Sequence, residues 1–301
     1  MIDYSVELIK NLDEFSIMNE AQSCHGIIFK HGEERSLNTV IPHIESFSNK
    51  VIELMESFDR KKILEALEDK IYENNLGKSP FRLLIDISLI SRKMIADIIS
   101  TILRLSRKHS LEINIVYSLA RYTPPNDLFA PNKRVQPVND TFTGWPSKPG
   151  LPVMTIVGLG YERDKALGAI EYLESSKTIL FIPNSSESQY KNDVFSANEA
   201  LLNAVDKNSK IEYDVENPIE SIFMVDKLLS SYGSRYKIVL FPFGPRIFYM
   251  TTLIAAIAHP QCAVWYVSGE DDESLVAQDR QSAKTFGFKF KVETNEKIKI
   301  I

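Results

Sequence analysis

The chain has 301 residues, with 35 lysines and arginines against 40 aspartates and glutamates, and its formal net charge at pH 7 is −5. A hydrophobic fraction of 44% and a charged fraction of 25% are typical of a globular protein. The mild acidity argues against direct nucleic-acid binding, which normally uses a basic surface. The two cysteines, Cys24 and Cys262, match no zinc or redox spacing, so we expect small buried thiols in a reducing compartment.

No membrane or export signal is visible in the sequence. The N-terminus lacks a basic segment followed by an apolar core, and no apolar run approaches the about 20 residues that cross a bilayer. We therefore expect a cytoplasmic protein without a membrane partner.

Short apolar or β-branched runs alternate along the chain with longer segments of helical period. This alternation predicts an α/β fold with a mostly parallel sheet and helices on both of its faces. The expected strands are Gly26–Lys30, Phe81–Ile87, Glu112–Ser118, Val153–Val157, Thr178–Ile182, Ile211–Tyr213, Lys237–Phe241, Ala263–Val267 and Phe288–Val292.

Two of the segments between these strands have apolar patterns that predict helices. Residues 38–75 predict two helices with a break near Phe58, because apolar residues recur at helical spacing from Val51. The segment Ile247–Ala258 is apolar nearly all round. Such a helix is buried, either in the centre of the fold or against a second copy of the chain.

A proline-rich segment interrupts the alternation. Seven of the 14 prolines lie between Tyr122 and Pro152, which predicts an ordered long loop or, alternatively, a linker. The chain then divides into an N-terminal α/β portion (1–121), this loop (122–152) and a C-terminal portion (153–301), although all three could form one continuous domain. Trp145 is a candidate to cover a ligand or, alternatively, to anchor the loop.

The turn after the strand ending at Val157 is a candidate ligand site, because open parallel sheets bind ligands beyond the carboxyl ends of their strands. Gly158 and Gly160 would let backbone amides approach an anion, with Tyr161 and Arg163 beside them. Arg163 stands where the dinucleotide fingerprint requires a small residue, so a nicotinamide cofactor is not expected. Alternatively, the glycines only permit a tight turn.

A second candidate turn follows the strand ending at Phe241. Gly244 allows an unusual backbone angle, and Arg246 would stand at a helix N-terminus, where the dipole disfavours a cation. An arginine there gains most when an anion shares the site. The alternative is an ion pair with a nearby glutamate.

A third turn follows the strand ending at Ile87. Asp86 would either bind a ligand hydroxyl or order the loop, and Ser88 and Arg92 follow it. Ser88 or Ser91 would alternatively cap the next helix.

The sequence favours neither a metal site nor a catalytic serine. The five histidines show no ligand spacing, and the acidic run Glu270–Glu273 matches no calcium loop. No nucleophile elbow is present. No cofactor is identified.

The turns that contain Asp86, Gly158 and Gly244 resemble those of a set of uncharacterised bacterial Rossmann-like proteins. The strand, turn, basic residue and apolar helix around Arg246 also look like CRISPR-associated Rossmann-fold sensors, which dimerise and bind cyclic oligonucleotides at this turn. Here Pro-Phe-Gly-Pro-Arg replaces their Gly- and Thr-rich turn ending in Lys. The resemblance implies a Rossmann-like fold, a homodimer and a role in bacterial antiviral defence.

Three functions are consistent with these observations. The first is binding of a nucleotide or other phosphorylated ligand at the strand ends. The second is hydrolysis of a nucleotide-type bond, with Glu162 or Asp86 as the catalytic carboxylate. The third is a scaffold for a protein encoded nearby. The sequence does not decide whether the protein is an enzyme.

Overall fold

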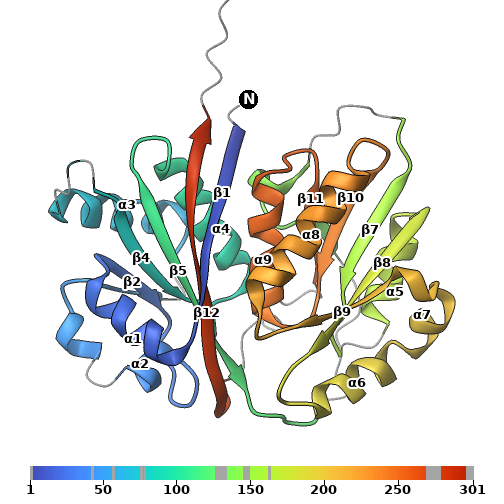
Figure 1. Ribbon diagram of the computed structural model, residues 1–301, viewed down its shortest axis with the longest axis horizontal. Coiled ribbons are helices and arrows are strands. Elements are labelled where there is room, and N and C mark those ends of the chain that lie inside the picture. The colour runs from blue at the N-terminus through green and yellow to red at the C-terminus, as the bar shows by residue number, and fades with distance from the viewer. Residues whose placement is uncertain are drawn as a thin grey trace, which may run out of the picture. The chain divides into compact units, whose positions relative to one another are not determined.

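The computed structural model describes residues 3–41, 44–55, 58–74, 77, 79–125, 134–144, 150–161, 164–268 and 279–295. The fold is α/β with two six-stranded mixed sheets, and most strand pairs are parallel. The α/β class and the mainly parallel pairing were predicted, whereas the two separate sheets were not. The chain forms two compact units, residues 1–121 with 277–301 and residues 122–276 (Figure 1).

The first unit contains the sheet β1-β12-β5-β4-β2-β3. Its elements are β1 (Asp3–Leu12), α1 (Glu14–Ser23), β2 (Gly26–Phe29), α2 (Leu37–Val40), β3 (Val51–Glu53), α3 (Arg60–Asn74), β4 (Phe81–Asp86), α4 (Arg92–Leu105), β5 (Leu111–Ala120) and β12 (Ser282–Asn295).

In the parallel part of this sheet, the order in which the chain adds its strands reverses between β2 and β4. The chain steps from β2 outward to its neighbour β3, then returns to the other side of β2 to form β4 and β5. β12 lies between β5 and β1 and pairs antiparallel with both. Apolar residues of α1 and α2, including Ile17 and Leu37, form a core with Ile27 and Leu84 of the sheet.

The second unit contains the sheet β6-β11-β10-β7-β8-β9. Its elements are β6 (Arg134–Pro137), β7 (Val153–Gly158), α5 (Lys165–Tyr172), β8 (Lys177–Asn184), α6 (Gln189–Ala197), α7 (Glu199–Ala204), β9 (Lys210–Asp214), α8 (Pro218–Tyr232), β10 (Lys237–Pro242), α9 (Arg246–Ile257) and β11 (Ala263–Ser268).

Helices cover both faces of the second sheet, as predicted. Val157 and Phe241 pack with residues of α5, α6 and α7. On the other face, the ring of Phe248 in α9 lies 5.3 Å from that of Phe181 and 4.4 Å from that of Tyr213, centroid to centroid. The parallel strands β7 to β11, numbered in chain order, lie in the order 3-2-1-4-5, so the order reverses between β7 and β10.

The predicted helix from Val51 is wrong. Residues Val51–Glu53 form the edge strand β3, which pairs parallel with β2, and Ile27 N–H donates to the carbonyl oxygen of Lys50 at 2.9 Å. Two adjacent β-branched residues favour a strand, and one buried side chain, Ile52, fixes it to the sheet. The second predicted helix of this segment is confirmed as α3.

The apolar helix is buried within a single chain. Every residue from Ile247 to Ile257 is at most 6% exposed without any second copy present. The prediction that this helix is buried is therefore confirmed, and the choice between the centre of the fold and a second copy stays a prediction. Among the described residues, no helix has both the length and the apolar character to span a membrane.

Candidate functional site

The turns that follow β7 and β10 meet at one edge of the second sheet. Gly158 and Pro242, the last residues of the two strands, are paired in register. Gly244 has φ +74°, and a Cβ built on it would stand 2.4 Å from the carbonyl oxygen of Leu159. Only glycine fits this backbone conformation and this contact. The structure thus brings two of the predicted turns together at the point where the strand order reverses.

Helix α9 begins at this contact. Its N-cap is Pro245, which provides no side-chain cap, and Arg246 is the first helical residue. The N–H groups at the start of a helix and the dipole favour an anion. Arg246 is half-buried beside them, so the helix start carries positive charge from both the backbone and a guanidinium.

The two glycines after β7 have different roles. A Cβ on Gly158 would stand 2.4 Å from the Phe248 ring, so the space beside this glycine is filled by α9 packing on the strand. Gly160 is buried, and its carbonyl oxygen accepts a hydrogen bond from Asn198 Nδ2 at 2.7 Å. Asn198, which lies between α6 and α7, holds the turn in place.

Three tyrosine rings lie beside the same turn. Tyr161 stacks on Tyr190 with 6.2 Å between ring centroids and 16° between planes, and Tyr122 and Tyr190 form a T-shaped pair with 5.2 Å between centroids. A hydrogen bond to Asp193, with a smaller contribution from burial, raises the pKa of Tyr122. The chain therefore supplies aromatic surface next to the candidate anion site.

Asp86 lies at the end of β4 in the first unit and is 1% exposed. One carboxylate oxygen accepts from Ser88 N–H (2.9 Å) and Ser88 Oγ (2.5 Å), and the other accepts from Leu37 N–H (2.6 Å) and Ser36 Oγ (3.4 Å). Burial raises the pKa of Asp86, although its hydrogen-bond donors and Arg35 act in the opposite direction. This carboxylate joins the turns after β2 and β4.

Ser88 and Arg92 belong to the same region as Asp86. The Ser88 hydroxyl also accepts a hydrogen bond from Ser118 N–H at 2.8 Å, so it is fully engaged inside the chain. The N-cap of α4 is Ser91, whose side chain accepts from Met94 N–H, and half-buried Arg92 follows it. Of the two serines considered for this cap, Ser91 is the one.

The predicted site residues thus belong to two different units. Gly158, Gly160, Tyr161, Gly244 and Arg246 are in the second, whereas Asp86, Ser88 and Arg92 are in the first. Trp145, Glu162 and Arg163 lie outside the described residues. No described observation favours the hydrolase hypothesis, since Glu162 is not described and the Asp86 carboxylate is bound by its own chain.

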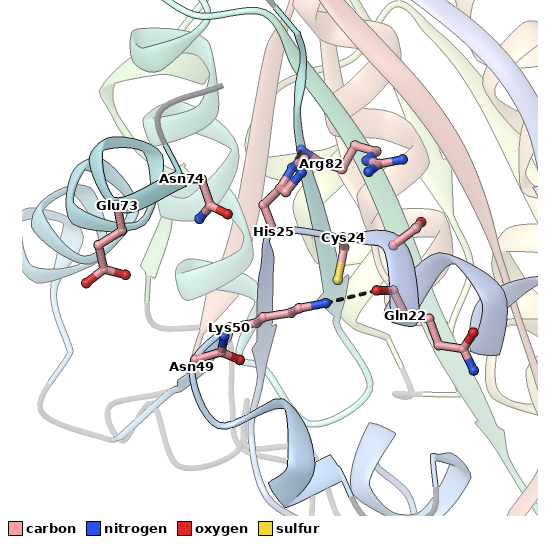
Figure 2. Close-up of a pocket in the computed structure, with 9 residues that line it drawn as sticks. Gln22, Cys24, His25, Asn49, Lys50, Glu73, Asn74 and Arg82 are labelled. Carbon is pink, nitrogen blue, oxygen red and sulfur yellow. Dashed lines mark hydrogen bonds between the residues drawn. The ribbon is translucent and has the colours of Figure 1, made fainter. Parts of the chain in front are cut away.

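A pocket that was not predicted lies in the first unit, at the amino ends of its parallel strands. Its lining includes His25, Lys50 and Arg82, which stand at or just before the amino ends of β2, β3 and β4 (Figure 2). These residues come together only through the strand order, which the sequence alone does not provide.

The part of the chain that the structure describes contains no group of three or more histidine, cysteine or acidic side chains arranged to hold a metal ion. The acidic run Glu270–Glu273 lies outside it. No protein-family model matches this sequence, and no curated protein shows significant similarity to it.

Proposed function

We propose that the second unit is a Rossmann-like module that binds a nucleotide or other phosphorylated ligand at the carboxyl ends of β7 and β10. One observation carries this proposal: the strand order reverses between β7 and β10, and the turns after these strands are in backbone contact through Gly244 and Leu159. Open α/β sheets bind their ligands at such a reversal.

The residues at this edge suit a phosphorylated ligand. The start of α9 and the guanidinium of Arg246 would bind the phosphate, because arginine forms two parallel hydrogen bonds with it. The Tyr161 ring, stacked on Tyr190, is an aromatic surface for a base. A cyclic oligonucleotide, the ligand of the sensors that the sequence resembles, is one member of this class, and a role in bacterial defence belongs to the same proposal.

A thermal-shift panel of mononucleotides, dinucleotides and cyclic oligonucleotides tests this function. A ligand at 100 times its dissociation constant adds about 2.7 kcal/mol to the free energy of unfolding. We expect at least one member of the panel to shift the melting temperature. A panel without any shift contradicts the proposal.

The variant Arg246→Ala tests the location. Loss of a charge-assisted hydrogen-bond donor weakens binding by about tenfold or more. The matched control is Arg235→Ala, because Arg235 precedes β10 at the opposite edge of the same sheet and its Nη2 donates to the carbonyl oxygen of Ser231. Equal affinity in wild type and Arg246→Ala would place the ligand elsewhere.

A further inference from the structure

The pocket in the first unit has a volume of about 370 Å³. It lies among the C-terminal end of α1, the amino ends of the parallel strands β2, β3 and β4, and the end of α3, and it contains Lys50 and Arg82 (Figure 2). Small-molecule sites usually begin at about 300 Å³. The pocket is therefore large enough for a small metabolite.

Positive charge dominates this pocket, in a chain whose net charge is −5. Lys50 Nζ donates to the carbonyl oxygen of Gln22 at 2.9 Å, and neither Lys50 nor Arg82 forms an ion pair with any described residue. The acidic residue in the lining, Glu73, is already bound by Lys70 at 2.9 Å. Two cations that form no ion pair with a described acidic residue raise the local concentration of anions.

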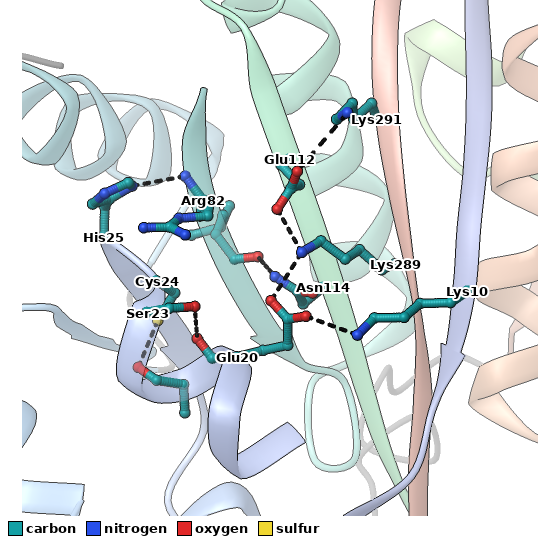
Figure 3. A network of polar contacts seen from close by, with 12 residues as sticks. Lys10, Glu20, Ser23, Cys24, His25, Arg82, Glu112, Asn114, Lys289 and Lys291 are labelled. Atoms are coloured by element: carbon teal, nitrogen blue, oxygen red, sulfur yellow. Dashed lines mark hydrogen bonds and ion pairs between the residues drawn. The ribbon is translucent and has the colours of Figure 1, made fainter. Parts of the chain in front are cut away.

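His25 adds a neutral donor. Its Nδ1 accepts a hydrogen bond from the backbone N–H of Arg82 at 2.9 Å, so the neutral ring carries its proton on Nε2. Figure 3 shows the Arg82 guanidinium beside the His25 ring, on the side of the Ser23–Cys24 end of α1. Three donors from three different segments thus meet at this edge of the sheet.

Cys24 forms part of the wall and is not a nucleophile. Burial raises the pKa of its thiol to about 11, and its Sγ lies 3.1 Å from the carbonyl oxygen of Ala21. The thiolate is the reactive form of cysteine, so the chemistry of this pocket is binding through charge and hydrogen bonds.

We propose that this pocket binds a small anionic metabolite through a phosphate or carboxylate group, which Arg82 and Lys50 hold by charge-assisted hydrogen bonds. The site lies in the first unit, whereas the function proposed above concerns the second, so each can fail without the other.

Calorimetric titration with pyrophosphate and with citrate, at low ionic strength, tests the site and separates the two anion classes. The titrations use Arg246→Ala, so that the proposed site in the second unit does not contribute. We expect at least one of the two anions to bind, and Arg82→Met to weaken that binding by about tenfold or more. Methionine keeps an apolar stem for packing and removes only the charged group.

Lys61→Met is the matched control, because Lys61 is 81% exposed and lies on α3 outside the pocket lining. It should bind like the parent chain. Equal affinity in Arg82→Met and Lys61→Met, or no binding of either anion, would overturn the proposal.

The titration of His25 followed by NMR gives a second readout. Burial lowers the pKa of this ring, and the charges of Arg82 and Lys50 lower it further. Glu73 and the thiol of Cys24 are the other titratable groups in the lining. An anion bound between the two cations must therefore raise the His25 pKa, and by linkage must bind more tightly as the pH falls through that pKa. An unchanged His25 pKa in the presence of a bound anion would show that the anion binds elsewhere.

Discussion

Gly244 and Leu159 are in backbone contact across two turns that are 85 positions apart in the sequence. The space between them leaves no room for a side chain, since a Cβ on Gly244 would stand 2.4 Å from the Leu159 carbonyl oxygen, and the glycine has φ +74°. The contact joins the end of β7 to the start of α9. Any residue larger than glycine at 244 must therefore separate the two turns.

We expect Gly244→Ala to lower the free energy of unfolding by about 3 kcal/mol, because it adds a backbone clash to the strain of positive φ. Gly77→Ala is the matched control, since Gly77 has φ +60° and open space around it. This control should lose about 1 kcal/mol. Chemical denaturation measures both values, and an equal loss in the two variants would show that the contact with Leu159 has no energetic importance.

Lys289 of β12 holds two partly buried carboxylates, Glu112 of β5 and Glu20 of α1 (Figure 3). Its Nζ lies 2.6 Å from Glu112 and 2.9 Å from Glu20, and all three side chains are at most 13% exposed. Removal of the shared cation leaves two acids close together without their common partner. We expect Lys289→Met to lower the free energy of unfolding by about 2 to 3 kcal/mol, a value between those for exposed and buried ion pairs.

Lys291→Met is the control on the same strand. Lys291 Nζ is 3.8 Å from Glu7 and 4.0 Å from Glu112, and its side chain is 35% exposed. Lys291→Met should lower the free energy of unfolding by less than about 1 kcal/mol. Equal costs at the two positions would show that burial of the Lys289 cluster contributes nothing.

The Lys289 cluster should also depend on pH. Burial alone would raise the pKa of Glu20, but hydrogen bonds and charge from Lys289 and Lys10 outweigh it and lower the pKa below 4.5. For Lys289, Glu112 and Glu20 outweigh the burial effect and raise the pKa above 10.5. The difference in stability between wild type and Lys289→Met should therefore be constant between about pH 5 and about pH 10. It should shrink as the pH falls through the lowered pKa of Glu20, or rises through the raised pKa of Lys289.

Both thiols should be unreactive in the native protein. Burial raises the pKa of Cys24 to about 11 and that of Cys262 to about 12, so almost no thiolate is present at pH 8. An aromatic disulfide reagent should therefore titrate neither thiol before unfolding and both in guanidinium chloride. Rapid reaction of one thiol in the native state would contradict the burial of that residue.

Central strands were predictable because they are buried on both faces. Leu83–Ile85 lies inside β4 and Ile238–Leu240 lies inside β10, and both segments are apolar throughout. Strand β1 was missed, since it has polar residues on one face and its single partner, β12, lies at the other end of the chain. Strand β6 was missed because it lies in a proline-rich segment without periodicity.

The candidate site was predictable only in part, because turn residues indicate geometry but not partners. The glycine pattern correctly indicated that Gly244 has an unusual backbone angle. By contrast, the donors to one of the two oxygens of Asp86 lie at Ser36 and Leu37, about fifty positions away. No local pattern could show that these two distant donors bind the carboxylate, or that Lys50 and Arg82 share a pocket.

The position of β12 has a consequence for how the chain folds during synthesis. Residues 122–276 form one continuous unit, which can fold once they have left the ribosome. The sheet of the first unit is completed later, because among the described strands β1 pairs with β12 alone and β12 also completes the pairing of β5. Until residues 282–295 emerge, β1 and β5 expose unpaired edges, which are sites for aggregation. Strand β1, which precedes residues 122–276 in the sequence, thus becomes structured after them.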